Sequence, residues 1–281
     1  MMPASTTTDI MPDSRFGSEA VVRQAARRFE HKYLVPESLL PPLRRLVARF
    51  ASPDRHAARR GVDAMPGYVV RTIYLDTSRL KHYHEADEGL DVRAKPRIRG
   101  YGDADPAADV FLEIKRRRGA VGAKDRAPVA WNSLHRLLST GDAERYVRTR
   151  AAIPRAVENA CRFLFHLRRD ALRPVLLVVY DREPYLGRFG PSLRITFDRR
   201  VRSVIHPSLD GLFEERGARP CLAARFVLEV KYDATFGFPA WLRPFIAEHG
   251  LVRQSLSKYW TCATDQGLAR TSMARGFRAI A

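Results

Sequence analysis

The sequence predicts an α+β protein built on an antiparallel β tunnel, a closed barrel of about eight strands with a charged interior, covered by helices. Three observations predict this class. Several segments alternate apolar and charged residues with the period of a β-strand. Amphipathic segments with a helical period lie between and after them. No clear linker divides the 281 residues into two domains.

The charged residues of the predicted strands gather on one face of each strand. In the segment 28–33, Arg28, Glu30 and Lys32 share one face. In the segment 110–115, Glu113 and Lys115 lie on the face opposite the apolar residues. The same alternation is present over 93–101, 193–198 and 226–232. The tetrapeptide Leu-Glu-Ile/Val-Lys occurs at 112–115 and again at 228–231, which indicates two matching halves of one sheet system.

These charged faces have two interpretations. A single strand of this kind is typical of an antiparallel sheet with one solvated face. A solvated face, however, usually mixes Thr, Ser and Gln with Lys, whereas these faces carry mainly Arg, Lys and Glu. Taken together they favour a barrel whose charged residues line the interior. Two like charges about 4 Å apart repel by roughly 4 kcal/mol at an effective dielectric near 20, so this interior is expected to bind phosphate chains strongly.

Helices are predicted from apolar stripes of helical period and from capping residues. They are expected at 37–50, 132–138, 142–149, 154–169 and 241–249, and a final helix is expected to begin at Lys258 with Ser257 as its N-cap. The loops 51–66 and 102–108 are rich in Arg, Asp, Pro and Gly and are expected to be mobile. Residues 1–24 are interpreted as a mobile N-terminal tail, 25–270 as one domain and 271–281 as a C-terminal tail.

Composition restricts the class of ligand. Forty-nine Lys and Arg residues against 31 Asp and Glu give a net charge of +18, which attracts polyanions. Charge alone would favour nucleic acid, but basic residues that alternate along strands, instead of forming an exposed cluster with interleaved aromatics, argue against specific nucleic-acid binding. The apolar runs are too short for a membrane helix and the three cysteines lie far apart, so we expect a reduced, cytoplasmic protein without a secretory signal or direct membrane insertion.

Eight motifs in order resemble the VTC domain, the polyphosphate-polymerase domain of the vacuolar transporter chaperone type in the triphosphate tunnel metalloenzyme superfamily. They are RFEHKYLV (28–35), IYLD (73–76), KPRIRGY (95–101), FLEIKRR (111–117), LRPVLLVVYDR (172–182), LRITFD (193–198), VLEVKY (227–232) and SLSKY (255–259). No single motif is specific, since Leu-Glu-Val-Lys alone is common. Their order, and their coverage of nearly the whole chain beyond residue 25, carry the resemblance.

The resemblance implies a polymerase that moves the γ-phosphate of ATP onto a growing inorganic polyphosphate chain. The basic residues that match the phosphate-binding positions of the family, taken as catalytic, are Lys32, Arg97, Arg99, Lys115, Arg182, Arg194, Lys231 and Lys258. The substrate-binding residues expected beside them are Arg28, Arg93, Lys124 and Arg173. Glu229 matches the glutamate that holds a divalent cation, Mn²⁺ or Mg²⁺, and Glu30 and Glu113 are added as metal-linked residues. Whether a membrane-protein partner exports the product stays open.

The chain departs from the wider superfamily at two positions. Members often open with Glu-x-Glu-x-Lys, whereas Arg28 replaces the first acidic residue, which puts two-metal hydrolysis in doubt and favours transfer. Pro96 lies inside a predicted strand and is expected at a bulge, because proline cannot donate to the ladder. His31, His82 and His84 form no catalytic motif, and the last two are placed in a loop-like segment.

Three alternative functions remain open at this point. The first is hydrolysis of tripolyphosphate or a nucleoside triphosphate in the same tunnel. The second is a non-catalytic polyphosphate-binding module, which the presence of Glu229 and Lys258 argues against. The third is nucleic-acid binding that depends on net charge alone.

Overall fold

The computed structural model describes residues 28–54, 57, 66–119, 121–189 and 192–269, so both predicted tails lie outside the described residues. Within these ranges the strands are β1 (Arg28–Pro36), β2 (Ala51–Pro53), β3 (Tyr68–Asp76), β4 (Val92–Tyr101), β5 (Asp109–Arg118), β6 (Val121–Ala130), β7 (Arg173–Gly187), β8 (Arg194–Ile205), β9 (Arg219–Pro220) and β10 (Arg225–Asp233). The helices are α2 (Leu40–Phe50), α3 (Lys81–Asp87), α4 (Leu134–Thr140), α5 (Ala143–Tyr146), α6 (Ala156–Arg169), α7 (Arg243–Glu248) and α8 (Lys258–Asp265). Short 3-10 helices are η1 (Glu37–Leu39), η2 (Trp131–Ser133), η3 (Asp210–Phe213) and η4 (Ala240–Leu242).

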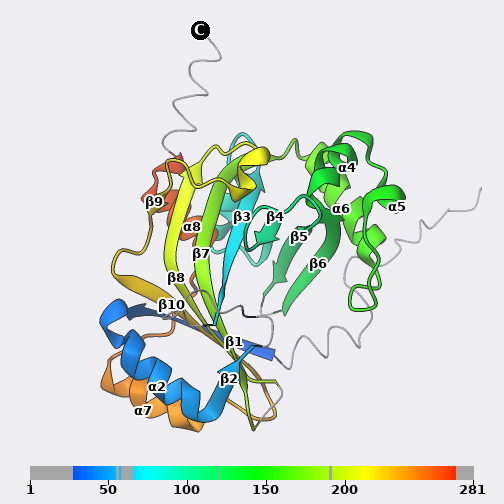
Figure 1. Ribbon diagram of the computed structural model, residues 1–281. Coiled ribbons are helices and arrows are strands. Elements are labelled where there is room, and N and C mark those ends of the chain that lie inside the picture. Colours follow the sequence, from blue (N-terminus) through cyan, green and yellow to red (C-terminus); the bar gives the residue numbers. More distant parts are fainter. Residues whose placement is uncertain (1–27, 55–56, 58–65, 120, 190–191, 270–281) are drawn as a thin grey trace, which may run out of the picture.

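All the strands belong to one antiparallel sheet (Figure 1). The strand order is β1-β10-β8-β7-β3-β4-β5-β6, with the short β2 paired to β7 and the short β9 paired to β8. The α+β class and the antiparallel sheet are therefore confirmed. The predicted closure of the barrel is not confirmed, because among the described residues no ladder joins β6 to β1. Each of these two outer strands instead forms an isolated bridge, Tyr33 of β1 with Arg253 and Val129 of β6 with Val147.

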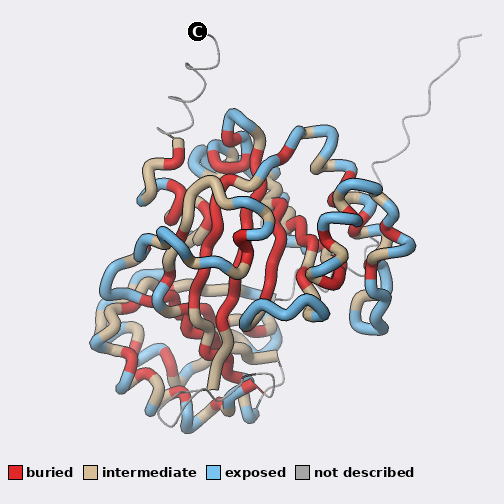
Figure 2. Tube along the Cα trace, turned by 45° about the horizontal axis from the view of Figure 1, so that its top comes forward, coloured by how far each residue is buried: buried red, intermediate tan, exposed pale blue. Residues whose placement is uncertain are grey.

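Helices cover the apolar outer face of the sheet in two separate groups (Figure 1). Helices α4, α5 and α6 cover β3 to β6, where Leu112, Val129 and Phe163 are at most 1% exposed. Helices α2 and α7 cover β1, β10 and β8, where Leu43 and Phe226 are fully buried. Continuous buried stretches follow the central strands, whereas buried and exposed residues alternate along the covering helices (Figure 2). The apolar faces predicted from the alternation thus lie under helices.

A third core lies on the opposite face of the sheet. Successive residues of a strand point to opposite faces, and Val179 belongs to the core under α6 whereas Tyr180 belongs to this third core. Helices α3 and α8 supply its other side through Tyr83, Tyr259 and Cys262. Helix α8 therefore covers part of the same face that carries the charged residues of the strands.

Helix α3 corrects one expectation. His82 and His84 belong to this helix and not to a loop. The reason lies earlier in the chain, where the buried carboxylate of Asp76 accepts hydrogen bonds from the backbone amides of His82 at 2.9 Å and Tyr83 at 3.0 Å. A carboxylate that accepts free amides at the start of a helix stabilises that helix. Because Asp76 belongs to β3 and not to the residue directly before α3, the local sequence pattern does not reveal this contact.

Pro96 corrects a second expectation. The pairing of β4 with β5 continues through Pro96 without a shift in register, so the expected bulge is absent. The pairing of β4 with β3 ends at Arg97, which leaves Pro96 with a neighbouring strand on one side. A strand edge of this kind tolerates a residue without an amide hydrogen.

The remaining boundaries shift by a few residues. Ala51–Pro53 forms β2 instead of a loop, because it extends the sheet along β7, and much of the rest of 51–66 lies outside the described residues. The helices expected at 132–138 and 241–249 each begin with a 3-10 turn, and the one expected at 142–149 is only the short α5. The final helix begins at Lys258 as predicted, with the Ser257 hydroxyl accepting from the amide of Trp260 at 3.4 Å.

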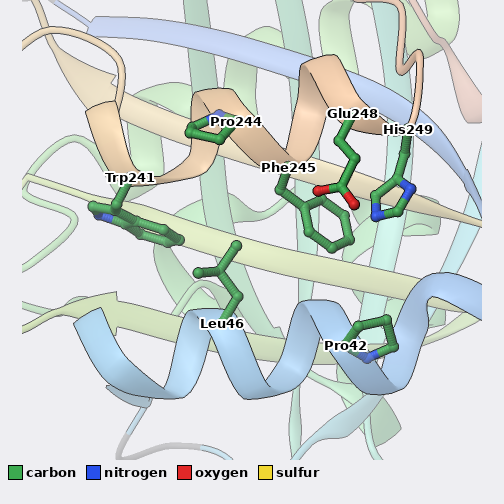
Figure 3. A pocket seen from close by; sticks show the side chains of 7 residues that line it. All are labelled: Pro42, Leu46, Trp241, Pro244, Phe245, Glu248 and His249. Carbon is green, nitrogen blue, oxygen red and sulfur yellow. The ribbon is translucent and has the colours of Figure 1, made fainter.

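A shallow groove lies between α2 and α7 on the outside of the molecule (Figure 3). It has a volume of about 430 Å³, and Leu46, Trp241 and Phe245 contribute apolar lining, with Glu248 and His249 at one end. The groove contains no Lys or Arg among its lining residues. It is therefore unrelated to the basic residues singled out by the sequence.

Candidate functional site

The charged faces of distant strands meet on the side of the sheet opposite the α4–α6 and α2–α7 helices. The ammonium of Lys115 on β5 lies 3.8 Å from Glu30 on β1, although these strands are not hydrogen-bonded to each other. Lys95 on β4 donates to the Ser257 hydroxyl at 2.7 Å, and Lys32 on β1 donates to the carbonyl of Leu256 at 3.1 Å. The curved sheet and the segment before α8 thus enclose a concave face, which we call the basic face.

Glu113 is the centre of the first charge cluster on the basic face. Its side chain is 0% exposed and is surrounded by Arg97 at 2.7 Å, Arg99 at 3.7 Å, Lys124 at 3.5 Å and Arg126 at 3.2 Å. Burial alone would raise the pKa of this carboxyl, but the four cations, Arg99 and Arg97 foremost, outweigh burial and hold the pKa below its usual range. The cluster contains more positive than negative charge, so it remains attractive to an anion.

Asp198 is the centre of the second cluster. Its fully buried carboxylate accepts two hydrogen bonds from the Arg182 guanidinium, at 2.6 and 2.8 Å, and lies 2.6 Å from the ammonium of Lys258. Tyr180 lies beneath both cations, with its ring centroid 5.3 Å from Arg182 and 4.7 Å from Lys258. Both cations are therefore held in fixed positions, and Asp198 raises the pKa of Lys258 against the opposing effect of burial.

Glu229 and Glu30 lie together at the junction of β10 and β1. Glu229 is opposite Lys32, and Glu30 is opposite Lys231, so the two carboxylates are diagonal neighbours. Glu229 contacts Lys231 at 2.5 Å and Glu30 contacts Lys32 at 3.0 Å. Burial favours the protonated form of Glu229, yet Lys231, followed by Arg182 and Lys32, keeps the pKa of Glu229 well below its ordinary value.

Lys95 and Lys115 have less compensation than the other cations of the basic face. Among the contacts of the described residues, the ammonium of Lys95 meets the Ser257 hydroxyl and no carboxylate. Burial and then the charges of Lys115 and Lys32 lower the pKa of Lys95 to about 7. Burial likewise lowers the pKa of Lys115 to about 8, in spite of Glu30. An anion bound here would relieve this repulsion.

Most of the residues singled out by the sequence lie on the basic face. Arg194 lies opposite Lys231, 3.4 Å from the hydroxyl of Tyr68 and 3.5 Å from Asp54. Arg93 is close enough to Lys95 to lower its pKa. The residues that the clusters above bring together are Lys32, Arg97, Arg99, Lys115, Lys124, Arg182, Lys231, Lys258, Glu30, Glu113 and Glu229.

Two predicted substrate-binding residues have to be considered separately from these clusters. Arg173 is exposed at the start of β7 and donates to the carbonyl of Ser78 at 3.5 Å, a contact outside the charge clusters. It precedes Pro174, where the pairing of β7 with β3 shifts in register, and the strand alternation is lost there. The backbone of Arg28 pairs with Asp233 at the beginning of β1, while its side chain lies outside the described features.

Several residues of the basic face were not predicted as site residues from the sequence. Arg126 contacts Glu113, donates to the Tyr101 hydroxyl at 3.1 Å and lies 3.5 Å from the centre of the Phe111 ring. The alternation of Lys124 and Arg126 could have indicated it. Three further residues, Asp198, Lys95 and Ser257, lie within predicted motifs, but their partners depend on strand pairing that the motifs do not reveal.

The carboxylates differ in how well they fit a divalent cation. Among the described residues no group of three or more His, Cys, Asp or Glu side chains could hold a metal by itself. A hard cation is often bound through one or two carboxylates and completed by substrate phosphates, and Glu229 with its neighbour Glu30 fits that arrangement. Glu113 does not, because four cations form ion pairs with its fully buried carboxylate, whereas Glu229 forms one among the described side chains, with Lys231, and has Glu30 beside it. The structure thus makes Glu113 a counter-ion for arginines.

An open antiparallel sheet whose concave face carries an excess of fixed cations has the charge to attract a polyanion. Comparison with known families agrees with this class of ligand. A family model described as the VTC domain matches residues 27–264. The chain therefore belongs to the VTC domain family, as the eight motifs predict.

Individual relatives are distant. No curated protein matches the chain. The structure is similar to a putative adenylyl cyclase, HpAC1 from Hippeastrum, described as having a dominant triphosphatase activity, with 13% identity, a TM-score of 0.45, and coverage of 85% of this chain and 96% of that one. It is also similar to the PH1819 protein from Pyrococcus horikoshii OT3, with 14% identity, a TM-score of 0.40, and coverage of 85% and 99%. At this level of similarity neither protein informs the activity of this chain.

Proposed function

We propose that the chain is a polyphosphate polymerase, which transfers the γ-phosphate of ATP onto a growing inorganic polyphosphate chain on the basic face. The observation that carries the proposal is the presence of two kinds of cation on this face: some are held in place by a buried carboxylate, and others have no strong counter-ion. Arg182 and Lys258 are locked on Asp198, whereas Lys95 and Lys115 have lowered pKa values and lack strong counter-ions. Membership of the VTC domain family supports the same substrate class.

Phosphoryl transfer requires mainly positioning and neutralisation of charge. A terminal oxygen of the acceptor chain would attack the γ-phosphorus of ATP, the bond from that phosphorus to the bridging oxygen would break, and ADP would leave. The guanidinium groups of Arg97, Arg99 and Arg182 suit phosphate oxygens because they donate from a rigid planar fork. The attacking oxygen is already ionised at neutral pH, so no side chain has to act as a base.

Glu229, with Glu30 beside it, would hold the divalent cation, Mn²⁺ or Mg²⁺. Bound there, the cation would neutralise charge on substrate phosphate oxygens. Lys231, followed by Arg182 and Lys32, lowers the pKa of Glu229 against the effect of burial, which keeps this carboxylate ionised for a cation.

The test is incubation of the purified protein with ATP and Mn²⁺, followed by phosphorus NMR. The proposal predicts resonances of internal chain phosphates together with ADP. Release of orthophosphate without chain phosphates would instead establish hydrolysis, and binding of polyphosphate without turnover would establish a non-catalytic module. Glu229→Gln should abolish metal-dependent turnover, because an amide oxygen binds a hard cation more weakly than a carboxylate does.

A further inference from the structure

Helix α8 brings two groups to the basic face from its first turn. Lys258, the first residue of the helix, contacts Asp198, and Ser257, its N-cap, accepts a hydrogen bond from Lys95. A helix of eight residues has few contacts of its own to fix its position. The position of these two groups therefore depends on the contacts of α8 with the rest of the fold.

The next residue, Tyr259, connects α8 to a buried carboxylate outside the basic face. Its hydroxyl donates to Oδ2 of Asp76 at 2.6 Å, and its ring stacks on Tyr74 with centroids 4.8 Å apart. Tyr259 is 1% exposed and Asp76 is 0% exposed. Burial and the carboxylate of Asp76 raise the pKa of Tyr259, so the hydroxyl stays protonated and remains a donor.

Asp76 is itself held rigidly. Its Oδ1 accepts from the amides of Thr77 at 2.7 Å and His82 at 2.9 Å, and its Oδ2 accepts from the amide of Tyr83 at 3.0 Å. The carboxylate is thus fixed by β3 and by the first turn of α3. Hydrogen bonds to a charged acceptor are stronger than neutral ones, and a rigid acceptor defines the position of its donor.

We propose that Asp76 and Tyr259 are positioning residues, whose hydrogen bond sets the place of Ser257 and Lys258 on the basic face and thereby the affinity for a phosphate chain. This inference rests on the proposed function for the identity of the ligand. Neither residue contacts the basic clusters directly. Both act through the first turn of α8.

The far end of the same helix offers a matched control. The hydroxyl of Tyr83 on α3 lies 3.0 Å from Oγ1 of Thr264, near the last turn of α8. Tyr83→Phe and Tyr259→Phe each delete one hydroxyl that links α8 to its surroundings. The first loosens the end remote from the basic face, and the second loosens the end that carries Lys258.

The experiment compares the melting temperature with the dissociation constant for inorganic tripolyphosphate, measured by calorimetry. Both variants should melt at a lower temperature than the wild type. Only Tyr259→Phe should weaken tripolyphosphate binding, by about tenfold, which corresponds to about 1.4 kcal/mol. Equal affinities in the two variants, whether both unchanged or both weakened, would overturn the positioning role.

Asp76→Asn provides a second route if Tyr259→Phe fails to fold. It removes the charge of the acceptor in the same hydrogen bond, so the Asp76→Asn variant should also weaken tripolyphosphate binding. Unchanged affinity would contradict the proposal. Where both single variants fold, the double variant should bind no more weakly than the poorer single variant, because both changes act on binding through the same hydrogen bond. A wild type that binds tripolyphosphate but makes no chain from ATP would reject the polymerase and leave this comparison valid.

Discussion

At the scale of single residues, the basic face contains two kinds of cation that differ in their partners. Arg97, Arg99 and Arg182 have buried carboxylates as partners, so they are part of the folded structure as well as candidates for binding phosphate. Lys95 and Lys115 have no buried carboxylate partner. The distinction determines which substitutions can test binding without unfolding the protein.

Removing the buried carboxylate of the first cluster should destabilise the fold. Glu113→Gln leaves Arg97 and Arg99 without their anion, and breaking a buried ion pair by removing one partner costs about 3–5 kcal/mol. The pKa of Glu113 is lower in the folded protein than in the unfolded chain. Its contribution to stability is therefore present above the ordinary pKa of a glutamate and should be lost as pH falls below that value toward the folded-state pKa. Urea denaturation measures both effects.

Glu30→Gln is the control for that change, because Glu30 keeps 30% of its side chain exposed and its ion pairs are partly solvated. Its substitution should lower the free energy of unfolding by less than about 1 kcal/mol. Similar losses for the two variants would show that Glu113 is not a special counter-ion.

Binding of a phosphate chain should depend on pH. The pKa of Lys95 is lowered to about 7 and that of Lys115 to about 8 in the free protein, and a bound polyanion should raise both. Binding therefore takes up protons, and affinity should fall as pH rises from 7 to 9, by about tenfold per pH unit for each proton taken up. Calorimetry in buffers of different ionisation enthalpy counts these protons.

Lys95→Arg separates this effect from general weakening of electrostatic binding. An arginine stays charged throughout the pH range, so the variant should bind but take up fewer protons. Proton uptake identical to that of the wild type would exclude Lys95 as its source.

At the scale of secondary structure, the sequence predicted the strands that have one charged face more completely than the others. Strand β3 is buried along nearly its whole length and so shows no alternation, which is typical of a strand covered on both faces. Helix α3 depends on Asp76, a contact from a preceding strand. Local periodicity cannot report either cause.

The site was predictable to a similar extent. Alternation placed Lys115, Arg97 and Glu113 on charged faces, but which of the cations were neutralised depended on register, since Arg97 lies directly opposite Glu113. The role of Arg126 depends on β6 pairing with β5. The cross-strand partner of each residue is known only once the strand pairing is known.

Gly100 in strand β4 should not tolerate a side chain. A Cβ atom there would lie 2.8 Å from the ring of Phe213 and 3.3 Å from Leu212. Phe213 in turn packs edge-on against Trp131, so it has little room to move. Gly100→Ala should therefore cost about 1–3 kcal/mol of stability, measured by urea denaturation.

Gly122→Ala on β6 is the matched control, because the nearest atom to its added Cβ is the carbonyl oxygen of Arg116 at 3.9 Å. This change should leave the free energy of unfolding within about 0.5 kcal/mol of the wild type. Equal losses at the two glycines would mean that the contact with η3 does not restrict β4.

At the scale of the whole molecule, the net charge of +18 has two explanations. It can attract any polyanion to the outer surface, or it can serve one concave face that takes an extended phosphate chain. In the described part of the chain no helix is long and apolar enough to cross a membrane. The distribution of charge over the fold, and not its sum, distinguishes the explanations.

The variants that test this distribution differ in position and not in charge. Lys95→Met with Lys115→Met removes two positive charges from the basic face. Because it also relieves repulsion and leaves no buried carboxylate unpaired, the double variant should be at least as stable as the wild type. Arg136→Met with Arg155→Met removes two positive charges from exposed positions, on α4 and directly before α6, where the Arg155 side chain is 65% exposed.

The most direct measurement is the shift in melting temperature caused by long-chain polyphosphate, compared with double-stranded DNA at equal phosphate concentration. A ligand at a hundredfold excess over its dissociation constant stabilises by about 2.7 kcal/mol. The basic face predicts a large shift with polyphosphate and a small one with DNA, loss of most of the polyphosphate shift in the Lys95 and Lys115 double variant, and little change in the Arg136 and Arg155 variant. Equal shifts for the two polyanions, reduced alike by both double variants, would contradict a dedicated phosphate-binding face.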